Sequence, residues 1–173
     1  MKIFLQYCGL LLLFCLFQSF IFERIQLGPF LYPCIYPLFL LLFPFGYNTI
    51  YLLLWAFVVG LNIDISTGVM GIHTSAALCL GMLRRNVLKL LTIKGDLGPL
   101  AIPGINTLGL PRYLIYVALS LFIHHAILFG LESFRLAYLH LTLARIVCST
   151  LLNTLLVVFV QAALFNRKHG SDL

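Results

Sequence analysis

The sequence contains few charged residues. Among 173 residues there are eleven basic and five acidic side chains, and charged residues make up only 9% of the chain. Soluble domains carry about 25% charged residues. So few charges do not cover the surface of a soluble globule of 19.5 kDa. The short length of chain outside the apolar segments also excludes a Rossmann domain, a P-loop domain and a large periplasmic catalytic domain.

Motifs for metal binding and catalysis are also missing from the sequence. The five cysteines stand singly in apolar segments, and without a C-x-x-C pair they support neither a zinc site nor a disulfide framework. No serine stands in a G-x-S-x-G context, and there is no H-E-x-x-H motif. The basic stretch 84–94 has no interleaved aromatic residues to stack on bases. We therefore expect no enzyme activity, no cofactor, no metal site and no nucleic-acid partner.

The sequence is rich in uncharged apolar runs. Hydrophobic residues form 62% of the chain, and the mean hydropathy is +1.07. Uncharged runs of 20, 39, 19, 19 and 21 residues separate the charges. A bilayer-spanning helix needs about 20 mostly apolar residues, so the run of 39 fits two spans and each other run fits one. The sequence predicts a single all-α membrane domain over 1–173 with about six transmembrane helices, near 2–22, 30–45, 47–62, 70–84, 112–131 and 141–164.

The first two predicted spans have features of their own. The apolar run after Lys2 is longer than a signal-peptide core and has no A-x-A-like cleavage site, so we interpret it as a retained anchor. The span over 30–45 contains Pro33, Pro37 and Pro44. Proline inside a span requires neighbours or water to satisfy the freed carbonyls. We therefore predict that this span is kinked, short or partly re-entrant.

The basic residues indicate an orientation in the membrane. With six spans, both termini lie on one side, and that side carries eight lysines and arginines against two on the other. By the positive-inside rule, both termini are predicted to be cytoplasmic. The cytoplasmic loop over 84–111 is basic at its start and rich in glycine and proline further on. The leucines between its charges suit a short interfacial helix on anionic headgroups.

The most distinctive polar residues surround one predicted turn. Asp64 and His73 flank Gly68 and Gly71, and Gly60 lies four residues before Asp64. One interpretation is an acid/base or proton-relay pair at the mouth of a cavity, because ionisable groups within spans are functional candidates. The other is structural: Asp64 ends one helix, a neighbouring hydroxyl caps the turn, and the glycines let the chain reverse. No second carboxylate lies nearby in sequence, which favours the structural interpretation.

Three further ionisable residues lie within predicted spans. His124 and His125 are about 100° apart on a helix, so they do not both face one metal, and we expect one of them to face the bundle. Arg145 has three possible environments. It snorkels outward from the first turn of the sixth span, or it pairs with Asp64, or it pairs with Glu132.

Residues 60–85 combine a G-x-x-x-D element, a glycine turn, a G-I-H element followed by small residues, and a basic end. These elements are Gly60, Asp64, Gly68, Gly71-Ile72-His73, Ala76-Ala77 and Arg84-Arg85. The combination resembles the most recognisable stretch of the MreD family of bacterial rod-shape-determining membrane proteins. The chain length, the six predicted spans and the lack of soluble domains are similar to that family as well.

This resemblance implies a fold similar to the six-helix substrate-binding subunits of energy-coupling-factor vitamin transporters. It also implies a non-enzymatic component of the cell-elongation complex in the bacterial cytoplasmic (inner) membrane, linking cytoskeletal filaments to peptidoglycan synthesis. The implied partners are a bitopic periplasmic protein like MreC, MreB-like filaments, a peptidoglycan glycosyltransferase and transpeptidase, and membrane lipid. The candidate residues for structure or partner interaction are Gly60, Asp64, Gly68, Gly71, His73, Arg84 and Arg85.

The similarity to transporter subunits supplies an alternative function, a membrane subunit that binds a vitamin or another small solute. Such a subunit encloses its ligand in a cavity with a few convergent polar groups. The candidate ligand contacts are Asn62, Asp64, His73, Asn153 and Gln161. They converge only if the third, fourth and sixth predicted spans meet.

Overall fold

The described part of the chain has only helical secondary structure, as the sequence predicts. The structure is a computed structural model, and it describes residues 2–25, 27–92, 98–133 and 139–165. Its helices are α1 Lys2–Phe20, the 3-10 helix η1 Phe22–Arg24, α2 Tyr36–Leu41, α3 Thr49–Thr67, α4 Ile72–Leu91, α5 Ile105–Leu108, α6 Leu110–Glu132 and α7 Leu139–Phe165.

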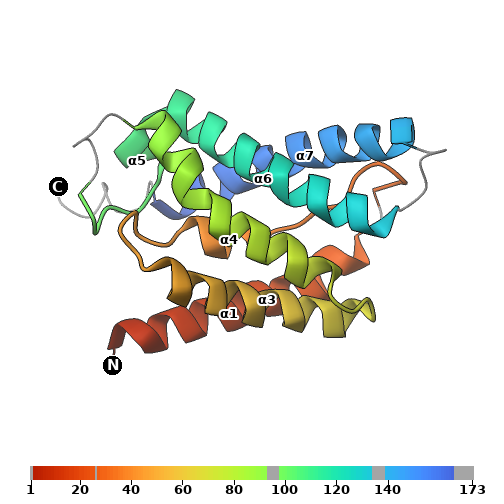
Figure 1. Ribbon diagram of the computed structural model, residues 1–173, viewed down its shortest axis with the longest axis horizontal. Helices are drawn as coiled ribbons and strands as arrows, with labels where there is room; N and C mark the ends of the chain where they lie inside the picture. The colour runs from red at the N-terminus through yellow and green to blue at the C-terminus, as the bar shows by residue number, and fades with distance from the viewer. Residues whose placement is uncertain (1, 26, 93–97, 134–138, 166–173) are drawn as a thin grey trace.

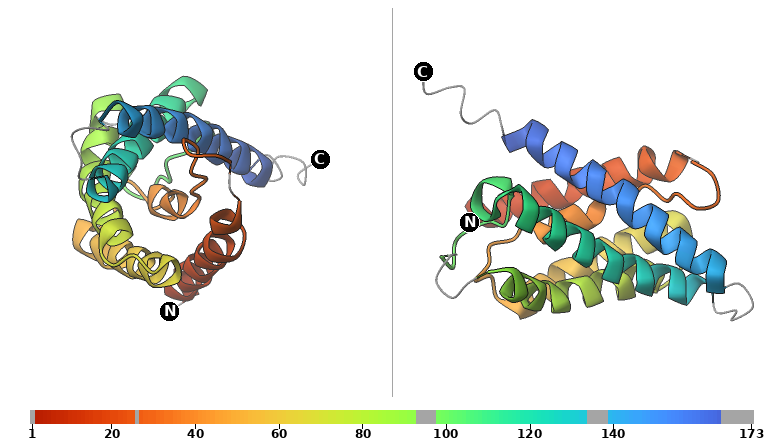
Figure 2. Two further views of the ribbon diagram at one scale, coloured as in Figure 1. Left: turned by 90° about the vertical axis from the view of Figure 1, so that its right-hand side faces the viewer. Right: turned by 90° about the horizontal axis from the view of Figure 1, so that it is seen from above.

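The five long helices surround the short helix α2. Seen end-on in Figure 2 (left), α1, α3, α4, α6 and α7 form a ring around α2 and the irregular chain that precedes it. The helices α3, α4, α6 and α7 pack side by side in that order, and α1 packs against α3. Figure 1 shows that α3, α4, α6 and α7 run in alternating directions, whereas α1 runs in the same direction as α3. The start of α1 and the end of α7 lie at the same end of the bundle.

The two ends of the bundle differ in charge. One end holds the start of α6 and the end of α4, and we call it the basic end because of Arg84, Arg85, Lys89 and Arg112. At the opposite end α3 turns into α4. We call this the acidic end because it holds the three carboxylates of the described residues: Glu23, Asp64 and Glu132.

Helix boundaries follow local chemistry. The side chain of Asn48 accepts a hydrogen bond from the backbone N–H of Ile50 and so caps the start of α3 (2.9 Å). That helix ends at Gly68, whose φ of 72° lies in the left-handed region. Pro111 stands in the first turn of α6, where a missing N–H costs nothing.

Four helices are long and apolar enough to cross a membrane. They extend over Phe4–Arg24, Thr49–Thr67, Leu110–Glu132 and Leu139–Ala163. The helix α4 is of similar length but carries three basic residues in its second half. Large apolar side chains are exposed on the outer faces of α1, α3 and α7, including Leu12, Leu54, Leu155 and Phe159. The chain is therefore a helical membrane protein, and the total of about six spans stays a prediction.

The second predicted span, over 30–45, contains only the six-residue helix α2. Pro33 has no N–H and a fixed φ, Pro37 suits the first turn of α2, and Pro44 lies beyond its end. We call residues 30–43 the central segment. From Pro33 to Leu41 every residue in it is buried, so a short and largely irregular piece of chain occupies the middle of the ring.

The fourth predicted span and the loop after it also have different boundaries. The sequence predicts a span over 70–84, whereas α4 continues to Leu91. The start of the expected interfacial segment is therefore the last part of a packed helix. The predicted loop 84–111 also contains α5 and the start of α6, while 93–97 lie outside the described residues.

Candidate functional site

The carboxylate of Asp64 caps the N-terminus of α4. Asp64 is fully buried near the end of α3. It accepts hydrogen bonds from the backbone N–H groups of Gly71 (2.9 Å), His73 (2.8 Å) and Thr74 (3.1 Å), and from the hydroxyl of Thr74 (2.5 Å). The first N–H groups of a helix have no partner within it, and the helix dipole favours a negative charge there. Asp64 therefore provides the hydrogen-bond acceptors for the free N–H groups at the start of α4.

The glycines around Asp64 make this contact possible. A Cβ on Gly60 would lie 2.5 Å from the Cα of Thr74, so only glycine lets α3 and α4 approach this closely. Gly68 and Gly71 have φ values of +72° and +87°, which glycine adopts without steric cost. The glycines thus let the chain reverse in a tight helical hairpin, in line with the structural interpretation of the sequence. Two details differ: α3 continues to Thr67, and the cap of α4 is Asp64 itself, because the hydroxyls of Ser66 and Thr67 bind the carbonyl of Ile63.

The ring of His73 and the backbone N–H of His73 contact different residues. Its Nδ1 lies 3.3 Å from the hydroxyl of Tyr36, and the same hydroxyl lies 2.6 Å from Nε2 of His124. Asp64 binds the backbone N–H of His73. The two side chains that sequence reasoning considered as an acid/base pair therefore have different partners: Asp64 binds the helix start, and His73 faces the central segment.

Both adjacent histidines of α6 face the interior, whereas the sequence argument expects one to do so. His124 and His125 are both fully buried. Nε2 of His125 lies 3.2 Å from the amide nitrogen of Asn153, and its Nδ1 lies 3.3 Å from the hydroxyl of Thr150. The two histidines thus join α6 to different neighbours.

Side chains of α7 hydrogen-bond to the backbone of the central segment. Asn153 accepts from the N–H of Cys34 (2.7 Å) and donates to the carbonyl of Tyr32 (2.8 Å). Ser149 accepts from the N–H of Tyr32 (3.1 Å) and donates to the carbonyl of Phe30 (3.1 Å). Irregular backbone at membrane depth is tolerated only where it is buried and satisfied by protein. Ser149 and Asn153 provide hydrogen-bond partners for this irregular backbone from the side of α7.

Gln18 of α1 satisfies the central segment from another side. Its amide oxygen accepts from the N–H of Ile35 (2.8 Å), and its amide nitrogen donates to the carbonyl of Pro33 (3.4 Å) and to Glu23 (3.0 Å). Gln18 is fully buried. An unsatisfied amide in such surroundings costs several kcal/mol, so this side chain stabilises the extended backbone.

Arg84 binds the other end of the central segment. It is 1% exposed. Its guanidinium donates to the carbonyls of Phe43, Leu41 (3.4 Å) and Pro44 (3.4 Å), and its Nε donates to the hydroxyl of Tyr116 (3.0 Å). A cation near the last carbonyls of α2 is also favoured by the helix dipole. Arg84 therefore connects α4, α6 and the central segment.

This placement corrects the expectation for the basic stretch. The sequence argument places Arg84 with Arg85 on an interfacial helix at anionic headgroups. Of the described basic residues in this stretch, Arg85 and Lys89 are exposed, while Arg84 points into the bundle. The hydrophobic pattern of a single helix does not show which of two adjacent arginines faces inward.

Two adjoining cavities hollow the acidic end. Their volumes are about 440 and 170 Å³, and Glu23, Tyr32 and Arg145 line both. The hydroxyl of Tyr32 donates to Glu23, and His73 and Glu132 line the smaller cavity. We call these five residues the acidic-end cleft. Of the cluster predicted around Asp64, His73 reaches the cleft, whereas the carboxylate of Asp64 is enclosed by its own donors.

Arg145 forms one of the three interactions left open by the sequence. Its guanidinium lies 2.9 Å from the carboxylate of Glu132 and 4.2 Å from the centre of the Phe129 ring. Both partners of the ion pair are partly exposed, so the pair contributes little to stability by itself. Because Arg145 lines both cavities and Glu132 lines the smaller one, the pair is part of the surface that a ligand or partner meets.

Comparisons with family models, curated proteins and solved structures give no match. The resemblance of residues 60–85 to the MreD family therefore rests on the motif residues themselves. The similarity of the fold to transporter subunits likewise stays a prediction.

The five residues considered for solute binding do not gather around one cavity. Asn62 is exposed on α3, Asp64 caps α4, and Asn153 binds the central segment. Gln161 lines a cavity at the basic end, away from the cleft that His73 lines. Sequence reasoning missed Gln18, Ser149, Tyr32 and Tyr116. A usable signal was present in α7, where Ser149 and Asn153 lie one helical turn apart in an otherwise apolar stretch.

Proposed function

We propose that this chain is a non-enzymatic assembly protein of the bacterial cytoplasmic membrane, the MreD-type component of the cell-elongation complex. In this role it links cytoskeletal filaments to peptidoglycan synthesis through a bitopic periplasmic partner like MreC. The use of its buried polar groups supports the proposal. Asp64, Arg84 and Asn153 all bind backbone groups of the chain itself. A catalyst or carrier instead keeps such groups available for a substrate.

The surfaces of the molecule agree with an assembly role. The outer faces of the helices are apolar and suit lipid or a partner's transmembrane helix. The acidic-end cleft adds a polar, carboxylate-bearing surface at the end that is periplasmic in the predicted orientation. A bitopic partner, with one span and a periplasmic domain, meets both surfaces at once.

A solute-binding subunit is the second candidate, and the acidic-end cleft is the observation that favours it. The cleft contains a histidine, a tyrosine, two carboxylates and an arginine around its two cavities. These groups are able to orient a small polar ligand. Because all of them come from the acidic end, a ligand bound there contacts His73 and Tyr32 but none of the basic-end residues.

A thermal-unfolding experiment on the purified protein in detergent separates the two candidates. A partner that binds only the folded form raises the unfolding temperature. We expect a bitopic periplasmic partner to be captured from solubilised membranes of the source cells and to stabilise the protein, while a panel of vitamins does not. The control variant is Asn62→Ala, at an exposed position of α3.

The opposite result has a clear signature. A rise of several degrees with one small molecule, abolished in His73→Gln and Tyr32→Phe but kept in Asn62→Ala, replaces the assembly proposal with the solute-binding one. Capture of no bitopic partner by a well-folded wild-type protein also contradicts the assembly role.

A further inference from the structure

A third cavity lies at the basic end, between α7 and the chain that leads into α6. Its volume is about 580 Å³, within the range of small-molecule sites. Its walls are mainly apolar and include Ile105, Leu110, Val158 and Ala162. None of the lining residues is charged. A ligand that fits these walls is therefore largely apolar and carries no net charge where it contacts them.

One buried polar atom in this cavity has no partner. Gln161 is 4% exposed, and its amide oxygen has no hydrogen-bond partner among the described residues. A buried acceptor left unsatisfied costs free energy, so it marks a place where a donor binds. The amide nitrogen of Gln161 lies against Gly104, where a Cβ would approach within 2.5 Å. The glycine thus provides the space in which this amide sits.

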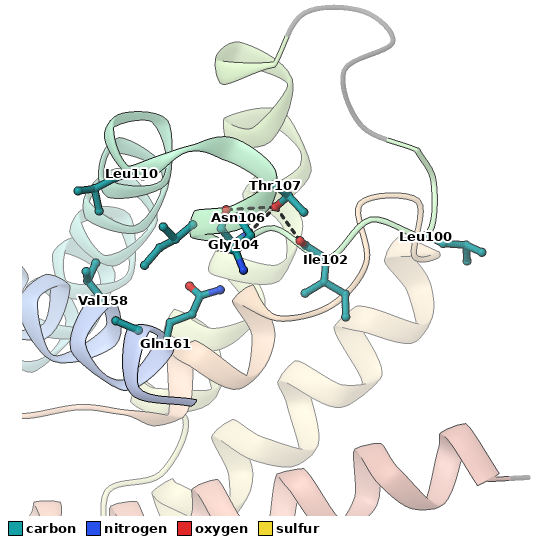
Figure 3. A pocket seen from close by; sticks show the side chains of 10 residues that line it. Leu100, Ile102, Gly104, Asn106, Thr107, Leu110, Val158 and Gln161 are labelled. Atoms are coloured by element: carbon teal, nitrogen blue, oxygen red, sulfur yellow. Dashed lines mark hydrogen bonds between the residues drawn. The ribbon is translucent and has the colours of Figure 1, made fainter. Parts of the chain in front are cut away.

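The polar groups of the cavity gather at one point. Figure 3 shows the amide of Gln161 reaching toward the loop that holds Asn106 and Thr107. The hydroxyl of Thr107 is already used, because it accepts from the N–H of Gly104 (2.8 Å) and donates to the carbonyl of Ile102 (2.9 Å). The amides of Asn106 and Gln161 therefore remain as the groups that recognise a ligand.

The position of the cavity points to a lipid. Leu110 begins one candidate span, and Val158 and Gln161 lie in the last turns of another. The chain beside the cavity exposes apolar side chains, with Leu100 85% and Ile102 42% exposed. Apolar loop residues at the end of two spans are typical of the boundary between acyl chains and headgroups. At this depth the surrounding molecules are lipids with an apolar chain and a polar head.

We propose that this cavity binds a neutral hydroxyl-bearing lipid, such as a monoacylglycerol, diacylglycerol or long-chain alcohol. The chain lies along the apolar wall of Ile105, Leu110 and Val158. The hydroxyl donates to the amide oxygen of Gln161 and accepts from the amide nitrogen of Asn106. The uncharged lining disfavours a fatty-acid carboxylate. This site is independent of the assembly role, because it lies at the opposite end from the acidic-end cleft.

Photo-cross-linking of the full chain in phosphatidylcholine nanodiscs tests the proposal. The probe is a monoacylglycerol with a diazirine in its acyl chain, and labelled peptides are mapped by mass spectrometry. We expect labelling to concentrate at 100–110 and 156–163. Unlabelled monoolein and oleyl alcohol compete, whereas oleate, with the same chain, competes poorly. A phosphatidylcholine diazirine probe gives the background of ordinary surrounding lipid.

Variants separate specific binding from general lipid contact. Val158→Trp fills the cavity and is expected to abolish the labelling, while Leu155→Trp, at a 69% exposed position of the same helix, leaves it unchanged. Gln161→Leu keeps the volume and removes the unpartnered amide. We expect this variant to need about fivefold more monoolein to displace the probe, as the loss of one hydrogen bond predicts. We expect its unfolding temperature not to fall.

Three outcomes overturn the proposal. One is labelling spread evenly along the outer faces of the helices. Another is equal competition by oleate and monoolein. The third is wild-type labelling in Val158→Trp. If Val158→Trp fails to fold, the change in competition with Gln161→Leu decides the matter, since the Gln161 side chain forms no hydrogen bond with the other described residues.

Discussion

Asp64 and Arg84 are buried charges near opposite ends of the bundle, and each hydrogen-bonds to backbone groups at a helix terminus. Asp64 accepts from N–H groups at the start of α4, and Arg84 donates to carbonyls at and beyond the end of α2. Each has the sign that the helix dipole favours at its position. A buried charge without such partners is very costly in an apolar environment. The fold uses both charges as helix caps.

The two caps differ in how far they reach along the chain. The donors to Asp64 lie 7 to 10 residues away in sequence, so that cap organises one hairpin. The partners of Arg84 lie 32 to 43 residues away, so it connects three separate parts of the chain. We therefore expect loss of Arg84 to destabilise the whole bundle and loss of Asp64 to weaken one turn.

The largest effect is expected for Arg84→Met. The substitution leaves carbonyls of the central segment and the hydroxyl of Tyr116 without their donor, which costs about 3–5 kcal/mol of unfolding free energy. Arg85→Met, at the adjacent exposed position, is the matched control and leaves the unfolding midpoint unchanged. The measurement is SDS titration of the purified protein in mixed micelles. Equal midpoints for the two variants contradict the role assigned to Arg84.

A smaller loss is expected for Asp64→Ala. Three backbone N–H groups and one hydroxyl lose their acceptor, at a cost of about 2–3 kcal/mol. Membrane insertion stays intact, because removing a carboxylate lowers the insertion cost. Hydrogen exchange at Gly71, His73 and Thr74 reports the loosened turn, with Asn62→Ala as the control on the same helix. Uniform loss of protection across the bundle, instead of at this turn, argues against a local cap.

The smallest of the three effects is expected for Gly60→Ala. The added Cβ would lie 2.5 Å from the Cα of Thr74, and separation of the two helices costs about 1–2 kcal/mol. Gly81→Ala is the matched control in α4, because a Cβ there meets its nearest atom at 3.4 Å, the end of the Leu53 side chain. The same SDS titration measures both variants, and a larger loss for Gly81→Ala refutes this account of the hairpin.

The sequence separation between contacting residues also explains which features the sequence could predict. The all-α class and the turn around Asp64 depend on hydropathy and on neighbouring residues, so local patterns were sufficient. The interior direction of Arg84 depends on carbonyls about 40 residues earlier. The length of α2 depends on Asn153 and Ser149, more than 110 residues away, which satisfy the backbone that a longer helix would have satisfied itself. The free amide of Gln161 likewise becomes visible only when the loop before α6 is in place.

The central segment also has consequences for biogenesis. When the ribosome has synthesised the central segment, the hydrogen-bond partners of the Tyr32 and Cys34 backbone have not yet been made. These partners, Ser149 and Asn153, belong to the last helix. Lipid offers no hydrogen bonds to such groups, so this segment cannot settle in the bilayer on its own. The segment must therefore stay within the insertion machinery or near the membrane surface until α7 has been synthesised and packs against it. Nascent chains that stop before residue 149 are thus expected to be recognised and degraded by membrane quality-control proteases, and completion of α7 is the step that commits the chain to its mature form.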